Sequence, residues 1–246
     1  MGSIRLPDTI SVPAHLSYSS LSTYAECGER YRLGRGYGLD KSTWFASVAG
    51  SAIHEITEAI DLNLDFEVGV EERTFASLFD ELLAKEAERG TEVKASGRVL
   101  KSIGKGGGPN KKDRDWWLIY GPTYVEAWRQ WRADNPSWKV AVMPSGEPGV
   151  EVKVSASMGD VPFVGYIDRL FWVDDSELVA IDLKTGALPP SKLQLGTYKV
   201  ALENQWGISP RFGAYWIASE GDVNKLWDLE HYTADYVANA FSMARR

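Results

Sequence analysis

Asp182 and Lys184 are the residues whose types and spacing first suggest chemistry. They lie two positions apart in the segment 179–186, which begins with an apolar run typical of a buried strand. Because successive side chains of a strand point to opposite faces, we expect the carboxylate and the ammonium to leave the same face, side by side. A lysine placed beside an acid in this way can offset the negative charge of a phosphate.

A second acid, Asp168, lies in the preceding apolar run, 161–173. The short acidic segment 174–177 between the two runs is typical of a turn, so the runs are predicted to form a β-hairpin. With a rise of about 3.3 Å per residue in each strand, Asp168 can come level with Asp182 across the hairpin. The sequence therefore predicts that two carboxylates and the Lys184 ammonium converge.

Converging carboxylates repel each other unless a pKa is raised, hydrogen bonds are donated to them, or a cation lies between them. Mg²⁺ or a similar hard divalent ion such as Mn²⁺ suits oxygen ligands, and one or two carboxylates commonly hold it together with water and phosphate oxygens. A neighbouring lysine can position or deprotonate a metal-bound water. This combination of groups is suited to metal-assisted hydrolysis of phosphodiester bonds.

Three sequence blocks in this region share a specific order and spacing. They are G-Y-I-D-R at 165–169, I-D-L-K-T-G at 181–186 and Q-L-G-T-Y at 194–198. Together they resemble the G-x-x-D-R, D-x-K-T-G and Q-x-x-x-Y blocks of the RecB-like branch of the PD-(D/E)XK nuclease superfamily. A lone D-x-K arises by chance in many proteins, whereas the three blocks in this order are a strong signal.

The resemblance implies an α/β fold with a core like that of restriction endonucleases. A mixed central sheet would be flanked by helices, with an additional N-terminal helical lobe. The expected organisation is a single nuclease domain over 1–246, with a mainly helical lobe at 16–137 and a sheet-containing catalytic core at 138–246. In size the chain resembles the compact exonucleases of phages and of CRISPR adaptation.

The resemblance also implies roles for individual residues. The implied ligands of one or two Mg²⁺ or Mn²⁺ ions are His54, Asp168, Asp182 and the backbone carbonyl of Leu183. Lys184 would position or activate the attacking water. Gln194 and Tyr198 lie four residues apart on one face of a predicted helix, where they would hydrogen-bond the site or the DNA backbone.

His54 follows Gly50 in a G-x-x-x-H pattern that resembles the first motif of the RecB-like branch. On spacing alone, the ordinary alternative is a lone histidine without a metal role. Glu58 lies one helical turn from His54 and could orient its ring, although it is expected to face solvent. Glu151, just before the predicted hairpin, is a weaker candidate for the site, since an exposed strand acid is an equal alternative.

A basic, glycine-rich segment near 94–114 has a composition unsuited to a regular helix or strand and is predicted to be a flexible loop. It could be a solubilising insertion, or it could close over a DNA strand beside a tryptophan that stacks on a base. The candidate DNA-binding residues are Lys105, Lys111, Lys112, Arg114, Trp116 and Trp117. The segment lacks a G-x-x-x-x-G-K-[S/T] phosphate loop, so no use of ATP is expected.

The composition of the 246 residues is that of an ordinary globular protein, with 44% hydrophobic and 25% charged residues. The net charge of −7 does not indicate a nucleic-acid binder, but locally clustered cations and a metal site are compatible with DNA binding. With Cys27 as the one cysteine, an internal disulfide and a four-cysteine iron–sulfur cluster are excluded, and Cys27 is expected to be buried. The sequence contains no apolar run of membrane-spanning length and no N-terminal signal pattern. We therefore expect a cytoplasmic protein, in the host cytoplasm if it is phage-encoded.

Hydrophobic periodicity predicts the elements that must position these residues. Helices are predicted at 16–27, 50–60, 71–89, 115–133, 191–206 and 233–243. Strands are predicted at 140–143, 150–156, 161–173, 178–183, 212–218 and 226–231. Most of the ten tryptophans are expected to fill the core. The two acids and the lysine thus lie in strands, and His54 approaches them from a helix.

The function predicted from these features is hydrolysis of DNA by a metal-dependent exonuclease that does not use ATP, in recombination, repair or phage DNA processing. The expected substrate is single-stranded DNA or duplex ends, a recombination or replication protein is a potential partner, and no membrane association is expected. Two alternatives remain: an endonuclease of the same superfamily, and a non-catalytic DNA-binding recombination protein that kept the fold. The acids around the lysine argue against the non-catalytic protein, because such a cluster is costly without a metal.

Overall fold

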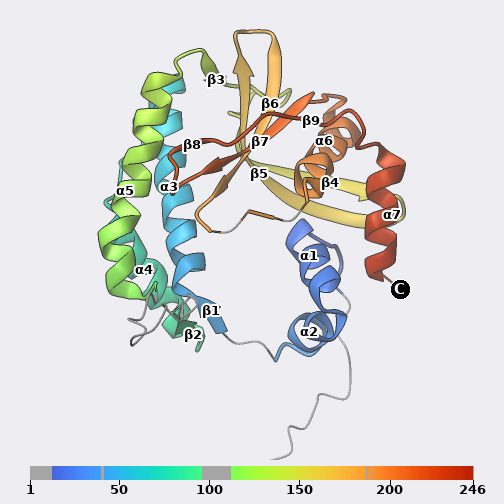
Figure 1. Ribbon diagram of the computed structural model, residues 1–246, viewed down its shortest axis with the longest axis horizontal. Helices are drawn as coiled ribbons and strands as arrows, with labels where there is room; N and C mark the ends of the chain where they lie inside the picture. Colours follow the sequence, from blue (N-terminus) through green and yellow to red (C-terminus); the bar gives the residue numbers. More distant parts are fainter. Residues whose placement is uncertain (1–12, 40–41, 96–111, 187, 190, 246) are drawn as a thin grey trace, which may run out of the picture.

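A curled mixed β-sheet forms the centre of the molecule and lies between two groups of helices in the computed structural model (Figure 1). The structure describes residues 13–39, 42–95, 112–186, 188–189 and 191–245. Within these residues the sheet contains β3 (Trp138–Val140), β4 (Val150–Met158), β5 (Val161–Val173), β6 (Glu177–Lys184), β7 (Phe212–Ile217), β8 (Asp222–Val223) and β9 (Trp227–Asp228). The strand order is β3-β5-β6-β7-β8, with β4 paired to β5 and β9 paired to β7. The predicted α/β class with a mixed central sheet is confirmed.

β5 and β6 form the predicted hairpin. They pair antiparallel in a register that begins with Arg169 opposite Ile181. Two aspartates in the connecting turn adopt left-handed φ angles of 50° and 55°, a conformation that aspartate tolerates better than most residues. Continuing the same register by one position brings Asp168 level with Asp182. The hairpin thus delivers both acids to one end of the paired strands.

β6 pairs in parallel with β7, and α6 (Leu193–Trp206) connects the two strands. This helix carries Gln194 and Tyr198 toward the end of β6. Gly196 lies where α6 approaches the segment before α7, and a Cβ on Gly196 would lie only 2.2 Å from the Tyr232 ring. A residue without a side chain is therefore required for α6 to pack at this depth.

Helices cover both faces of the sheet (Figure 1). On one face lie α1 (Tyr18–Glu26), α6 and α7 (Ala234–Arg245). On the other lie α3 (Phe45–Phe66), α4 (Phe75–Glu88) and α5 (Arg114–Asp134). α2 (Gly28–Tyr31) and a π-helix at Arg32–Gly36 follow α1, and β1 (Ser42–Trp44) and β2 (Glu92–Lys94) form a separate parallel pair. Among the described helices, none combines the length and the apolar character that a membrane span requires.

Aromatic side chains fill the core between α3, α5 and the sheet. Trp117, Trp128 and Trp216 are fully buried. Trp128 stacks on Trp131 at a centroid distance of 5.1 Å and meets the ring of Trp216 edge-on at 5.0 Å. These contacts fix α5 against β7. Of the ten tryptophans, four are buried in the core and four are partly buried against it, whereas Trp44 and Trp172 are exposed, so the core buries fewer of them than expected.

A buried ionic network joins α3, α5 and β5 behind the sheet. Arg169 donates from Nε to Asp61 at 2.5 Å and from Nη2 to the Thr57 hydroxyl at 2.9 Å. Arg132 lies 3.2 Å from Asp61 and donates to Asp65 at 2.7 Å. Because charges inside a protein are costly unless paired, each member of the network depends on its partners.

Several elements differ from the predictions. The strand predicted at 140–143 is β3, which begins and ends earlier because the ladder with β5 stops at Val140. The run 226–231 contributes only the two residues of β9, and the short strands β1, β2 and β8 were not predicted. The expectation that Cys27 is buried is wrong. Cys27 is exposed between α1 and α2, where its sulfur accepts a hydrogen bond from the Arg30 N–H at 3.4 Å and caps α2.

Asp65→Ala is expected to lower the free energy of unfolding by about 3 kcal/mol, since it removes a partner from the buried Arg132 guanidinium. The Val140 N–H, which donates to the same carboxylate at 2.8 Å, also loses its acceptor. Urea denaturation followed by tryptophan fluorescence measures the change. Asp134→Ala, at an exposed position near the end of α5, is the matched control. Equal stability of the two variants would contradict the importance of the network.

Candidate active site

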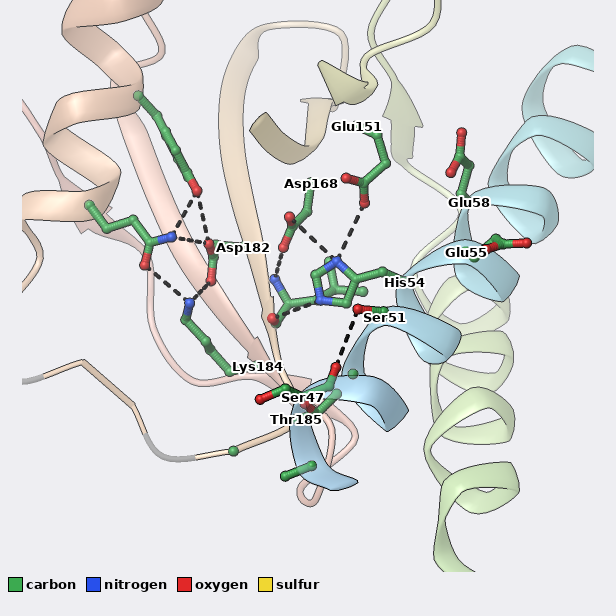
Figure 2. Close-up of a pocket in the computed structure, with 16 residues that line it drawn as sticks. Ser47, Ser51, His54, Glu55, Glu58, Glu151, Asp168, Asp182, Lys184 and Thr185 are labelled. Atoms are coloured by element: carbon green, nitrogen blue, oxygen red, sulfur yellow. Dashed lines mark hydrogen bonds and ion pairs between the residues drawn. The ribbon is translucent and has the colours of Figure 1, made fainter. Parts of the chain in front are cut away.

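An open cleft of about 700 Å³ lies between the first half of α3 and the ends of β6 and α6. Its polar lining includes His54, Glu151, Asp168, Asp182, Lys184 and Gln194. Figure 2 shows these side chains in two adjoining groups, with His54, Asp168 and Glu151 on one side and Asp182 and Lys184 on the other. The predicted site residues thus share one cleft, but they do not converge on a single point.

The first group contains His54, Glu151 and Asp168. The Nδ1 atom of His54 is 3.4 Å from Oε1 of Glu151 and 3.5 Å from Oδ1 of Asp168. One ligand atom from each of the three residues lies within 4.8 Å of the others. This is the arrangement that a single cation could bridge.

The peptide of Leu183 ties the first group to β6. Its N–H donates to Oδ2 of Asp168 at 2.6 Å, and its carbonyl oxygen is 3.3 Å from Nε2 of His54. Gly50, one helical turn before His54, permits the approach of α3, since a Cβ there would lie 3.1 Å from Oγ1 of Thr185. The backbone of β6 therefore sets the orientation of both the acid and the imidazole.

Glu151 reaches the group through an irregularity at the start of β4. Val150 pairs with Arg169 and Val152 pairs with Ile167, whereas Glu151 between them has a φ of 46°. A left-handed conformation is costly for a residue with a side chain and is characteristic of functional positions. The Nη1 of Arg169, 3.3 Å from Oε1 of Glu151, holds the carboxylate from behind. Sequence reasoning gave Glu151 less weight because the strand pattern carries no sign of this distortion.

The second group is centred on Asp182. Its Oδ2 forms an ion pair with Lys184 at 2.6 Å, so the two residues stand side by side as the strand periodicity predicts. Gln194 donates from Nε2 to Oδ1 of Asp182 at 2.6 Å and accepts from Lys184 Nζ at 3.1 Å. Tyr198 donates its hydroxyl to Oδ1 of Asp182 at 3.2 Å. Gln194 and Tyr198 are both buried, and both line the cleft beside Asp182.

The electrostatics of the site reflect its crowded acids. Burial, reinforced by the nearby Asp182 and Glu151 carboxylates, raises the pKa of Asp168 to about 7. Burial opposes protonation of His54, but the attraction of Asp168 and the hydrogen bond to Glu151 prevail and raise its pKa to about 9. Burial and the two aspartates raise the pKa of Tyr198, so its hydroxyl keeps the proton that it donates to Asp182. His54 is thus positively charged at neutral pH. Its charge balances part of the negative charge of the acids, as the charge of a bound metal would.

The donor set of the first group fits a hard divalent cation. Two carboxylates, one imidazole and the nearby Leu183 carbonyl supply oxygen and nitrogen ligands of the kind that Mg²⁺ and Mn²⁺ accept. Asp182 lies outside the three-residue cluster and is engaged by Lys184. The predicted ligand His54 and the weaker candidate Glu151 therefore both lie next to Asp168. The sequence patterns did not indicate how close these residues are.

Four of the predicted DNA-binding residues, Lys112, Arg114, Trp116 and Trp117, lie in the described part of the chain, and none of them lines the cleft. Lys105 and Lys111 fall outside the described residues. Trp117 is fully buried, so the prediction that it could stack on a base is wrong: its ring faces the core between α3 and α5. Trp116 is half-buried, with Lys112 Nζ at 4.5 Å from its ring centroid, and Arg114 pairs with Asp80 at 2.7 Å.

Comparisons with known proteins found a matching family and two similar proteins. A family model described as the PD-(D/E)XK nuclease superfamily matches residues 15–241. The Gene 69 protein of Mycobacterium phage D29 is 26% identical over 234 residues, which cover 92% of this chain and 84% of the phage protein. The crystal structure of SSO0001 aligns with 84% of this chain and 76% of its own, with a TM-score of 0.31 and 10% sequence identity. The family match includes α3, the hairpin and α6, which together supply the cleft.

Substitutions at Glu151 are expected to separate the contribution of its carboxylate to metal binding from the cost of its left-handed backbone. Glu151→Ala and Glu151→Gly both remove the carboxylate, so each is expected to weaken Mn²⁺ binding on the order of tenfold or more. Glu151→Gly also relieves the left-handed backbone and should be about 1 kcal/mol more stable than Glu151→Ala in EDTA. Calorimetric titration and urea denaturation measure the two effects. Wild-type affinity in both variants would remove Glu151 from the metal site, and equal stability would contradict the strain.

Metal binding is expected to strengthen as the pH rises from about 6 to 9. Protons on Asp168 and His54, whose pKa values are raised to about 7 and about 9, must leave before these groups become ligands. In EDTA, the same bound protons stabilise the folded protein. This contribution to the free energy of unfolding is lost as the pH rises through the two raised pKa values. The Mg²⁺-induced rise in Tm should therefore grow with pH. A shift that is independent of pH, or equal in Asp168→Asn, would contradict this assignment.

Proposed function

The chain belongs to the PD-(D/E)XK nuclease superfamily, and from this premise we propose that it is a metal-dependent DNA exonuclease. The observation that carries the proposal is the pairing of two groups in one open cleft. One is the His54, Glu151 and Asp168 cluster, and the other is Asp182 with Lys184. A cation site beside a positioned lysine is what hydrolysis of a phosphodiester requires.

Mg²⁺ or Mn²⁺ would be held by His54, Glu151 and Asp168, with the Leu183 carbonyl and Asp182 facing the same cleft. When bound, such an ion supplies Lewis-acid stabilisation of phosphate charge and lowers the pKa of a water ligand. The protein buries Asp168 beside Asp182 and Glu151, and burial, reinforced by these two acids, raises the pKa of Asp168 to about 7. An iron–sulfur cluster held by four cysteines has no place here, because the chain has one cysteine.

Lys184 presents its ammonium to the cleft from the end of β6. Asp182 and Gln194 fix this group at 2.6 and 3.1 Å, which limits the orientations that it can adopt. From this position the ammonium can donate to the attacking water or to a non-bridging phosphate oxygen. Its role is to orient the nucleophile and to offset the negative charge that develops during attack.

Gln194 and Tyr198 act as positioning residues for Asp182. Gln194 Nε2 donates both to the acid at 2.6 Å and to the tyrosine hydroxyl at 2.7 Å, and the tyrosine donates to the same acid oxygen. These contacts leave Asp182 little freedom in a buried environment. The sequence-based alternative is that the pair also hydrogen-bonds the DNA backbone, since both residues line the cleft.

We propose exonuclease action, and not only nuclease action in general. It is supported by the three sequence blocks, which resemble the RecB-like branch of the superfamily, and by the size of the chain, which resembles that of compact phage exonucleases. Independence from ATP is expected because the sequence has no phosphate-binding loop. We place the activity in recombination, repair or phage DNA processing.

Digestion of end-labelled linear DNA, compared with closed circular DNA, tests the proposal. Single- and double-stranded forms of each would be incubated with Mg²⁺, Mn²⁺ or EDTA. Metal-dependent loss of linear DNA with circles spared is expected, because an exonuclease needs an end. Cleavage of circles would favour an endonuclease instead. Absence of cleavage in every metal by folded protein would favour a non-catalytic DNA-binding protein.

Lys184→Ala and Asp182→Ala are expected to lower kcat by about 10²-fold or more, since Lys184 would contact the reacting phosphate or its water and Asp182 holds Lys184 in place. Circular dichroism and thermal melting check that the fold is retained. Lys139→Ala, which removes an exposed lysine on β3, serves as the charge control and should keep wild-type activity. Full activity of either active-site variant would contradict the assigned roles.

A further inference from the structure

A row of lysines and aromatic rings extends from the cleft across β7 and β9. Nζ of Lys184 is 5.6 Å from the centroid of the Tyr215 ring, and Nζ of Lys192 is 4.8 Å from the same centroid. Nζ of Lys192 and Nζ of Lys225 are each 4.5 Å from the centroid of the Trp227 ring. These five residues are called the lysine–aromatic row below.

The outer lysines of the row differ from most cations of this acidic protein. Within the part of the chain that the structure describes, Lys192 and Lys225 form no ion pair with a carboxylate, whereas Lys184 and Lys199 both do. The net charge of the chain is −7, and among the described cations Arg35, Lys112 and Lys153 share with these two lysines the lack of an ion pair with a carboxylate. An ammonium that rests on a ring keeps its full charge, which leaves it available to an anion.

We propose that Lys192 and Lys225 bind backbone phosphates of the DNA strand next to the scissile bond, so that the strand passes the α6 side of the cleft. The inference rests on the proposed function, because it places the reacting phosphate at Lys184. The contacts are independent of sequence, since a lysine bound to a phosphate reads charge and not base edges. The row thereby gives an acidic protein a local cationic path.

The row is short enough to lie along a few phosphates of one strand. The Nζ atoms of Lys184 and Lys192 cannot be farther apart than the sum of their distances to the centroid of the Tyr215 ring. The same limit applies to the Nζ atoms of Lys192 and Lys225 and the Trp227 ring. One strand of a duplex advances about 3.4 Å along the helix axis per phosphate. The three ammonium groups therefore span only a few nucleotides beyond the scissile phosphate.

The rings also prepare the lysines for binding. Tyr215 is fully buried in β7 and Trp227 is half-buried in β9, so neither ring moves freely. A lysine whose stem lies on a fixed ring has already lost part of its rotamer freedom, and less entropy is lost when a phosphate binds. A free surface lysine lacks this advantage.

The competing explanation is that the contacts only stabilise the fold. A lysine over an exposed or half-buried ring contributes about 0.5–1 kcal/mol. Loss of such a contact would lower the free energy of unfolding but would leave the salt dependence of DNA binding unchanged. Salt dependence therefore separates the two explanations, because it reports the number of phosphates that the protein contacts.

The test is fluorescence anisotropy with labelled oligonucleotides, single-stranded and duplex, in EDTA so that no strand is cut. Salt would be varied over about 50 to 200 mM, where the slope of log K against log salt is steep. Lys192→Gln and Lys225→Gln are each expected to reduce the slope by about 1, and to weaken binding equally for oligonucleotides of different sequence. Lys139→Gln, at a lysine on β3 that pairs with Asp65 at 3.9 Å, removes the same charge and should leave the slope unchanged.

Slopes equal to wild type in both variants would overturn the inference, and so would a slope that falls equally in Lys139→Gln. Reduced thermal stability with an unchanged slope would assign the row a structural role only and would also overturn it. The outcome is independent of the proposed function, because binding is measured without metal. Reduced slopes in a protein that cuts no DNA would support the phosphate contacts while contradicting the nuclease mechanism.

Discussion

The enclosure of Asp168 among other acids is the constraint on which the site depends. Its carboxylate is buried beside Glu151 and close enough to Asp182 for burial and repulsion to raise its pKa to about 7. The Leu183 N–H and the charged His54 ring relieve part of this cost. A divalent cation would relieve it more fully, since it brings two positive charges to a site built from hard ligands. The arrangement of the acids therefore suits a divalent cation.

The rest of the fold holds this unfavourable arrangement in place. Arg169, next in sequence to Asp168, enters a buried network with Asp61 and also supports Glu151 from behind. The aromatic core around Trp128 fixes α5 and α3 against the sheet, and α3 delivers His54. Strain at Glu151 persists because its neighbours Val150 and Val152 are both paired with β5. Packing of the core thus offsets the unfavourable arrangement of groups at the cleft, as is common at functional sites.

Local patterns were sufficient to predict what depends on a single strand or hairpin. The side-by-side placement of Asp182 and Lys184 follows from strand periodicity, and the hairpin between β5 and β6 follows from the acidic turn. Contacts that depend on the meeting of distant elements could not be predicted in this way. The left-handed backbone of Glu151, the exposure of Cys27 and the burial of Trp117 all depend on neighbours that the local sequence does not specify. The division of the site into two groups could not be predicted for the same reason, since it depends on the hydrogen bonds that Gln194 and Tyr198 of α6 donate to Asp182.

The most direct measurement is a crystal structure of the protein soaked with Mn²⁺, with anomalous diffraction used to locate the ion. A peak among His54, Glu151 and Asp168 is expected, because this cluster combines suitable ligands with unbalanced negative charge. Anomalous density elsewhere on the protein, with these three side chains in unchanged contact with one another and no ion between them, would contradict the assignment of the cleft as a metal-dependent active site.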